Sequence, residues 1–210
     1  MGSSGSSDTA SFWRTAGLSA LIVAVIGAGT TIVVTLINRG SSEQSRQTNS
    51  ARGKQASVEA RTAGLSLVGS EDVRTSATSR LPNSGDITYD PANTVDGDAQ
   101  TAWSEGRPGP GVGETLTYRF TRPINLRRIV VLNGYAKSNE LFERNARVRV
   151  ANIETGQGVR TANLRDTKSP QRLTFASGRT NFVKLTIERV YPGTRYADTL
   201  ISEVEFYAQS

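Results

Sequence analysis

The densest group of side chains able to bind an ion lies between Asn93 and Trp103, in the sequence Asn-Thr-Val-Asp-Gly-Asp-Ala-Gln-Thr-Ala-Trp. Asp96 and Asp98 flank Gly97, and glycine permits the backbone angles of a tight turn, so both carboxylates can fold toward one point. Two carboxylates that approach each other repel unless a positive charge lies between them. Calcium accepts carboxylate, hydroxyl and carbonyl oxygens in flexible geometry at about six to eight positions. The loop therefore predicts a structural calcium site.

The residue types that the chain lacks restrict its chemistry. The sequence contains no His and no Cys. Disulfides, zinc sites of the usual kinds, cysteine nucleophiles and histidine general bases are thereby excluded. Asp and Glu pairs outside the ion loop form no obvious catalytic grouping. We therefore expect a protein that is not an enzyme.

The first third of the chain is unsuited to a soluble core. Residues 16–37 contain no charged side chain and are rich in Leu, Ile, Val, Ala and Gly. As an α-helix rising about 1.5 Å per residue, this segment would reach roughly 33 Å, enough to cross a bilayer. A cleaved signal peptide is the alternative, but the apolar run exceeds the usual length of about 7–15 residues and no Ala-x-Ala-like site follows it. We expect a transmembrane helix, preceded by a disordered tail (residues 1–15) and followed by a flexible linker rich in Ser, Gln and Thr (residues 38–69).

From Val73 onward, short alternating segments are separated by Gly, Pro, Asn and Asp. Leu116, Tyr118 and Phe120 alternate with polar residues, as in a strand with one face toward the core and one toward water. Such spacing is typical of an all-β sandwich with about eight strands, placed in one domain over residues 70–208. The expected strands are residues 73–79, 114–120, 128–132, 147–153, 158–164, 171–175, 182–187 and 200–207.

Charge argues against one class of partner. The formal net charge is +6, but the Arg residues of the strand-like region are interspersed with acidic residues. Nucleic-acid binding requires clustered Lys and Arg together with stacking aromatic residues. We expect no nucleic-acid partner.

The ion loop and four downstream segments carry a resemblance to a known family. These segments are residues 133–138, 141–148, 190–196 and 201–206, and they occur in the family's order. From about Ser70 to Tyr207 the chain resembles discoidin domains, the galactose-binding-like jelly rolls related to the C domains of coagulation factors V and VIII. It is similar to their bacterial branch, the NADase-type glycan-binding domain. The resemblance implies a jelly-roll β-sandwich.

The resemblance also implies a ligand set for the ion. In discoidin-like carbohydrate modules, the first Glu of a Ser-Glu-Val-Glu strand such as residues 202–205 reaches the metal. Asp96, Thr101 and Glu203 would then supply side-chain oxygens, and Asn93 and Asp98 would supply backbone carbonyls. The resemblance places Trp103 inside the core, although a Trp in this position could also stack on a sugar.

Three long loops, residues 103–113, 134–146 and 191–199, would carry the binding function, because strands only position such loops. Sugar hydroxyls take planar polar partners, and the C–H faces of sugars rest on aromatic rings. Loops that pack on themselves with solvated charges are the alternative. The candidate ligand-binding residues are Tyr135, Lys137, Asn145, Arg195, Tyr196 and Asp198.

We therefore expect a membrane-anchored carbohydrate-binding module that acts at the cell surface on a glycan or cell-wall carbohydrate. The alternative is a protein–protein interaction or scaffold domain tethered to the membrane. Basic residues follow the apolar segment, so the positive-inside tendency alone would keep the domain in the cytoplasm. The resemblance favours the outside, and large domains can translocate despite flanking charge. We expect a single-pass membrane protein with an extracytoplasmic domain.

Overall fold

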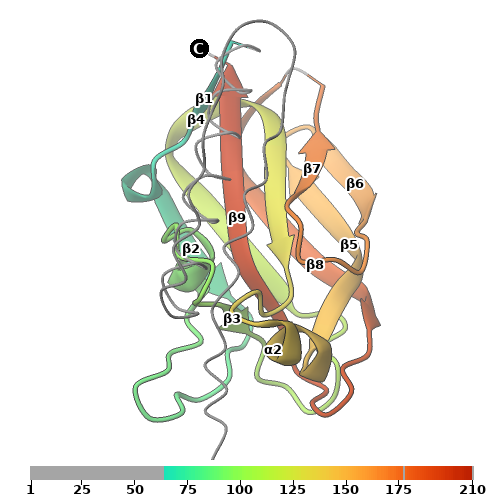
Figure 1. Cartoon of the computed structure of the whole chain (residues 1–210). Coiled ribbons are helices and arrows are strands. Elements are labelled where there is room, and N and C mark those ends of the chain that lie inside the picture. The colour runs from blue at the N-terminus through green and yellow to red at the C-terminus, as the bar shows by residue number, and fades with distance from the viewer. Residues whose placement is uncertain (1–63, 177, 210) are drawn as a thin grey trace, which may run out of the picture. The chain divides into compact units, whose positions relative to one another are not determined.

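The computed structural model describes residues 64–176 and 178–209. This part of the chain contains nine β-strands. All of these residues belong to one compact unit. Figure 1 shows β9 beside β4 in the front layer, with the short helix α2 at one end. The elements are β1 (Leu65–Leu67), η1 (Ser70–Asp72), β2 (Val73–Ala77), η2 (Pro91–Thr94), β3 (Trp103–Ser104), β4 (Thr115–Asn133), α2 (Asn139–Arg144), β5 (Ala146–Thr155), β6 (Gly158–Asn163), β7 (Gln171–Thr174), β8 (Arg179–Tyr191) and β9 (Thr199–Gln209).

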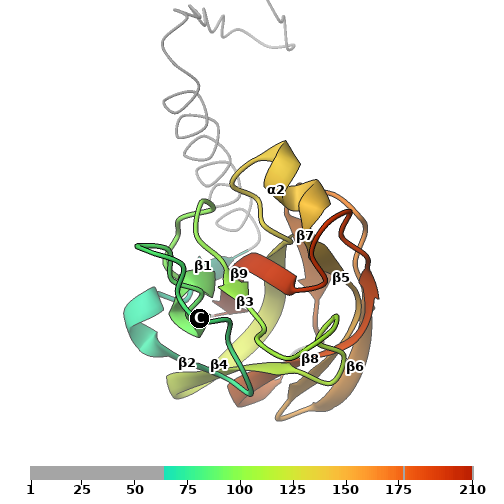
Figure 2. The same ribbon diagram turned by 90° about the horizontal axis from the view of Figure 1, so that it is seen from below.

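Strand β4 connects the layers of the sandwich because its two halves have different partners. Its first half pairs with β2 and β8, and its second half pairs mainly with β9 and β7. The pairing with β8 shifts register between Arg119 and Ile124. A short parallel pairing of β5 with β9 brings the remaining edges together. The strands consequently surround a common core, as the view from below shows (Figure 2).

The predicted alternation is confirmed in the core. Leu116, Tyr118 and Phe120 of β4 are buried, and the intervening Arg119 is exposed. The ring of Phe206 on β9 meets Tyr118 edge to face at 4.9 Å and Phe120 at 5.2 Å. Aromatic pairs favour this geometry because the positive edge of one ring meets the negative face of the other.

Two segments differ most from the sequence-based expectation, and β3 lies in a stretch that was expected as a loop. Residues 114–120 and 128–132 were expected as separate strands, but both belong to β4, which stays extended through the intervening Pro123. The end of the predicted linker also forms a strand, because Leu65 of β1 pairs with Gln209 of β9. A three-residue strand is too short to produce a periodic pattern, and it depends on the edge that β9 offers.

The predicted tail (residues 1–15), the predicted transmembrane helix (residues 16–37) and the linker up to residue 63 lie outside the described residues. Within the described ranges, no helix is both long and apolar enough to cross a membrane.

Candidate functional site

The ion loop folds around its own side chains. Asp96 accepts a hydrogen bond from the backbone N–H of Asp98 at 2.8 Å and another from the Thr101 hydroxyl at 2.9 Å. The Thr101 hydroxyl also lies 3.0 Å from the carbonyl oxygen of Asp98 and 3.3 Å from that of Asn93. Gly97 at the tip of the turn has a φ of +78°, a left-handed conformation that glycine adopts without strain. The structure therefore gathers the oxygen atoms of four predicted ligands in one turn.

Glu203 lies on β9, the last strand of the domain, and its side chain reaches this turn. Its Oε1 accepts a hydrogen bond from the backbone N–H of Gly97 at 2.9 Å. Burial raises the pKa of Glu203 to about 8, and the nearby carboxylates of Asp96 and Glu205 add to the increase, whereas the Gly97 bond opposes it. The two predicted acidic ligands, Asp96 and Glu203, therefore meet in a place where their negative charges disfavour each other.

The oxygen atoms gathered here are of the types that a hard cation binds. The number of carboxylates among them is small. Carboxylate, hydroxyl and carbonyl oxygens are the ligands that calcium prefers. Among the described residues, no three or more acidic, His or Cys side chains group closely enough to hold a metal. The Asp98 carboxylate accepts the N–H of Gln100 at 2.9 Å, so the Asp98 oxygen that faces Thr101 is its carbonyl. Asp96, Gly97 and Glu203 line a hollow of about 180 Å³.

Trp103 anchors the ion loop to the core. Its ring is fully buried, and its Nε1–H donates to the carbonyl of Ser79 at 3.0 Å. Asn93 is also buried, and its amide donates to the carbonyls of Thr88 at 2.9 Å and Ala102 at 3.0 Å. The interior position of Trp103 implied by the resemblance is confirmed, so this ring is not a sugar-stacking surface.

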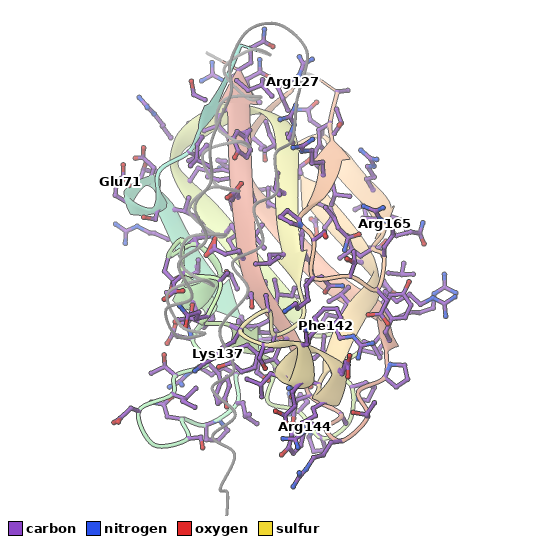
Figure 3. All side chains as sticks on the ribbon, in the orientation of Figure 1. Glu71, Arg127, Lys137, Phe142, Arg144 and Arg165 are labelled. Atoms are coloured by element: carbon purple, nitrogen blue, oxygen red, sulfur yellow. The ribbon has the colours of Figure 1, made fainter. Side chains whose placement is uncertain are left out.

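Two of the three loops expected to bind ligand meet at the end of the sandwich that carries α2. We call residues 134–145 the α2 loop and residues 192–198 the Tyr196 loop. The N–H of Ala146, just after the α2 loop, donates to the carbonyl of Asp198 at 3.0 Å. Figure 3 shows Lys137, Phe142 and Arg144 at this end, whereas Arg127 lies at the opposite end.

The exposed aromatic ring of this surface is Tyr196, which is 40% exposed. The guanidinium of Arg195 lies 5.3 Å from the centre of its ring. Lys137 is exposed on the α2 loop, and Asp198 is partly exposed beside Tyr196. An exposed ring beside a guanidinium and a carboxylate, with Lys137 exposed on the neighbouring α2 loop, offers apolar stacking together with hydrogen-bonding groups, which is the combination that a sugar requires.

Two of the predicted ligand residues are buried instead. Tyr135 is 5% exposed and packs with Ala102 and Leu200. Asn145 is 8% exposed, and its amide donates to the carbonyl of Leu141 at 2.8 Å within the α2 loop. Their positions support the surface from below and leave Tyr196 as the ring that a ligand can reach.

Sequence reasoning did not select Tyr89, which the structure brings to this end. Tyr89 is half-buried and packs on the cluster that contains Tyr135. Burial raises the pKa of Tyr89, and Asp198 and Tyr196 raise it further, so these groups lie close together. The one signal was an aromatic residue inside the polar segment 82–92, immediately before the ion loop.

A buried acidic side chain lies beneath the same surface. Glu105 is fully buried and accepts hydrogen bonds from the backbone N–H groups of Arg107 at 2.7 Å and Thr199 at 3.3 Å. Burial raises its pKa, and the charge of Asp198 contributes to the increase. Since Thr199 begins β9, Glu105 fixes the end of the Tyr196 loop.

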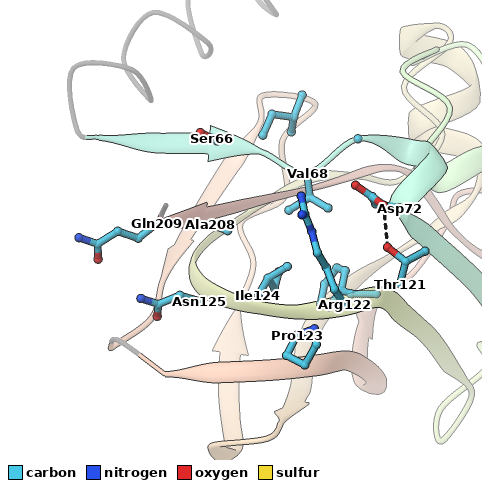
Figure 4. Close-up of a pocket in the computed structure, with 13 residues that line it drawn as sticks. Ser66, Val68, Asp72, Thr121, Arg122, Pro123, Ile124, Asn125, Ala208 and Gln209 are labelled. Carbon is cyan, nitrogen blue, oxygen red and sulfur yellow. Dashed lines mark hydrogen bonds between the residues drawn. The ribbon is translucent and has the colours of Figure 1, made fainter.

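A larger hollow of about 440 Å³ lies where β1 and η1 face the bend of β4. Val68, Phe120 and Ile124 are among its apolar lining, and a 2.6 Å hydrogen bond from Thr121 to Asp72 borders it (Figure 4). Its lining also includes Gln209 at the end of β9 opposite to the Tyr196 loop. None of the predicted site residues lines this hollow.

Comparison with known families gives one match that spans most of the chain. The model of the family described as "NAD glycohydrolase translocation F5/8 type C domain" matches residues 69–207. No curated protein matches this sequence.

Solved structures share the fold. A family 32 carbohydrate-binding module of Clostridium perfringens NanJ, solved with galactose, is 16% identical with a TM-score of 0.53, covering 68% of this chain and 98% of that chain. Another module from Clostridium perfringens, solved with GalNAc-β-1,3-galactose, is 19% identical with a TM-score of 0.55, covering 68% and 100%. A mycobacterial arabinofuranosyltransferase, AftD, is 20% identical with a TM-score of 0.51, covering 67% of this chain and 10% of that chain. These likenesses show that the described domain has the discoidin-type β-sandwich fold of such modules.

Proposed function

This chain belongs to the family of NAD glycohydrolase translocation F5/8 type C domains, and we propose that it is a non-catalytic glycan-binding module. The observation that carries the proposal is the surface around Tyr196. It combines one exposed ring with Arg195, Lys137 and Asp198 at the loop end of the sandwich. The modules of Clostridium perfringens that share this fold were solved with galactose and with GalNAc-β-1,3-galactose, which supports a sugar as ligand.

The proposed site is shallow, and its affinity is correspondingly weak. One stacking ring and a few polar side chains suggest a Kd on the order of 0.1–1 mM, or about −5 kcal/mol. Several tethered copies acting together on one surface would convert weak single contacts into useful attachment. The proposal therefore includes anchoring through the predicted helix of residues 16–37, with the domain on the extracytoplasmic side.

Calcium is proposed as a structural ion of the turn around Gly97. Asp96, Thr101 and Glu203 would contribute side-chain oxygens, and Asn93 and Asp98 would contribute carbonyls. The support is the meeting of two carboxylates from distant parts of the chain, whose repulsion a cation would relieve. When bound, calcium supplies no chemistry here and would join the ion loop to β9.

The test is a titration of the full chain in detergent micelles with galactose and GalNAc-β-1,3-galactose, followed through backbone amide NMR shifts. We expect saturable shifts in the Tyr196 loop, the α2 loop and the segment around Tyr89. A glycan array with a wider panel of sugars would then identify the preferred ligand.

The scaffold alternative makes a different prediction. If no glycan shifts any loop while a protein partner shifts residues of the Tyr196 loop, the surface is a protein contact. Shifts confined to the hollow between β1 and β4 would place the ligand elsewhere and reject the proposed site.

A further inference from the structure

Arg147, at the start of β5, is a buried cation with an unusual number of contacts. Its side chain is 8% exposed. Nε and Nη2 donate to the two carboxylate oxygens of Asp166 at 2.9 Å and 2.6 Å. Nη1 donates to the carbonyl oxygens of Asn145 at 2.9 Å and Pro192 at 3.0 Å. The planar fork of a guanidinium can satisfy a carboxylate and two carbonyls at once, whereas an ammonium cannot match that geometry.

The same side chain also contacts the α2 loop through the face of its guanidinium and through its aliphatic stem. The guanidinium lies 5.1 Å from the ring centre of Phe142, the buried residue of α2. The stem of Arg147 lies against Gly134, where a Cβ atom would come within 2.5 Å of its Cγ. Arg147 therefore contacts the beginning, the helix and the end of the α2 loop.

The Tyr196 loop is attached to the same helix by backbone hydrogen bonds. The last carbonyls of a helix have no partner within the helix and must find one elsewhere. The Glu143 carbonyl accepts the N–H of Thr194 at 2.9 Å, and the Arg144 carbonyl accepts those of Arg195 at 3.1 Å and Tyr196 at 2.8 Å. The position of the Tyr196 ring therefore follows the position of α2.

We infer that Arg147 is the positioning residue of the Tyr196 surface, joining the α2 loop, the Tyr196 loop and Asp166 into one unit. Side chains such as Ser138 and Asn145 add local support within the α2 loop, whereas the supports that the two loops share are the Arg147 fork and the end of α2. The coupling of the two loops follows from these contacts alone, whereas its effect on sugar binding rests on the proposed function.

Hydrogen–deuterium exchange of the full chain tests the coupling without any ligand. In Arg147→Lys, amides of residues 134–145 and 192–198 should exchange faster together, by roughly tenfold, as expected for the loss of one or two hydrogen bonds. Amides of β4 and β9 should stay protected. Loosening of one loop alone, or of neither, would overturn the inference.

A charge swap separates the fork from the ion pair. Arg147→Asp combined with Asp166→Arg can restore the ion pair, but Asp at position 147 cannot donate to the carbonyls of Asn145 and Pro192. We expect both loops to remain loose in this double variant, and recovery of normal exchange would reduce Arg147 to an ordinary salt-bridge residue. Lys184→Gln, which breaks the exposed pair with Glu154, is the matched control and should leave both loops unchanged.

If Arg147→Lys also loosens β4 and β9, Asp166→Asn decides the question, because it keeps Arg147 and removes only the charge of its partner. Both loops should then stay protected, because the fork keeps its bonds to the carbonyls of Asn145 and Pro192, and loops that loosen would reduce Arg147 to an ordinary salt-bridge residue and refute the inference. A galactose titration of each variant adds the functional readout. Absence of binding in the wild type would count against the proposed function while the exchange result still stands. Unchanged affinity in a variant with loosened loops would remove the positioning role.

Discussion

The backbone N–H of Gly97 donates to the Glu203 side chain at 2.9 Å, across a separation of 106 positions in the sequence. This bond joins the turn of the ion loop to the last strand of the domain. Since Asp96 lies beside the same carboxylate, the joint is also the place where two negative charges meet. Its strength should therefore depend on calcium and on pH.

Calcium should stabilise the full chain against unfolding, and Glu203→Gln should abolish the effect. A ligand that binds only the folded form adds about 2.7 kcal/mol at a hundredfold excess over its Kd. Thermal melts of the domain with calcium and with chelator measure this difference. Glu205→Gln, on the same strand but outside the predicted ligand set, is the control and should keep the calcium effect. Equal midpoints with and without calcium in the wild type would contradict the proposed site.

Without calcium, stability should fall as the pH rises from about 4.5 to about 8. Burial raises the pKa of Glu203 from 4.5 to about 8, assisted by Asp96 and Glu205. The folded protein then keeps a proton that the unfolded chain has lost, so the free energy of unfolding decreases through this window. Glu203→Gln stays neutral and should flatten the slope. Tyr118 also faces Glu203, but its pKa is raised, so it stays protonated in this window. Urea unfolding in chelator at several pH values tests the prediction, which an unchanged slope in the variant would refute.

Trp103→Ala should destabilise the domain by about 3–5 kcal/mol, the usual cost of removing a large buried aromatic side chain. The ring is fully buried, and its removal also leaves the carbonyl of Ser79 without the indole N–H. Urea unfolding gives the measurement. Val159→Ala is the control, because Val159 is 64% exposed and should change stability by less than about 0.5 kcal/mol. Similar losses for both substitutions would show that Trp103 is not the anchor of the ion loop.

Gly134→Ala should be more harmful than Gly85→Ala. Both glycines have positive φ angles, +72° and +59°, so each alanine introduces backbone strain of about 1 kcal/mol. At Gly134 the new Cβ would also lie 2.5 Å from Arg147 Cγ, whereas at Gly85 nothing lies within 4 Å. The midpoints of thermal unfolding of the two variants compare backbone strain alone, in Gly85→Ala, with strain plus a steric clash, in Gly134→Ala. Equal midpoints would mean that Arg147 can move aside at little cost.

Tyr196→Ala should weaken galactose binding by about tenfold or more, the loss expected for about 1–3 kcal/mol of stacking and apolar contact. The midpoint of thermal unfolding should hardly change, because the ring is 40% exposed. Tyr196→Phe keeps the ring and should retain most of the affinity. An amide-shift titration provides both the affinity and the location of binding, and unchanged affinity in the alanine variant would exclude Tyr196 as the stacking residue.

Local pattern was sufficient for the strands whose two faces differ. The alternation of Leu116, Tyr118 and Phe120 identified core positions, because successive side chains of a strand point to opposite faces. Likewise, Asp96, Gly97 and Asp98 identified a tight turn lined by carboxylates, since glycine tolerates the left-handed backbone that the turn requires.

Other features depended on partners far away in the chain. Tyr135 and Tyr196 are both tyrosines in polar loops, and only packing decided that the first is buried under Ala102 and Leu200 while the second is exposed. Arg147 lies in one of the segments that carry the family resemblance, residues 141–148, but that resemblance assigned it no role. Its role appears when the strand register brings Asp166 and Pro192 to the same guanidinium.

The sequence by itself therefore determined the all-β class, the alternating core and the acidic turn, because each depends on neighbours within a few residues. The tertiary structure decided which loops meet, which tyrosine faces solvent and which arginine holds the loops. Those outcomes depend on the register of strands that pair across about a hundred positions, as Trp103 of β3 does with Ile201 of β9. A one-residue change of register would turn every side chain of a strand to its other face, and no local pattern records that choice.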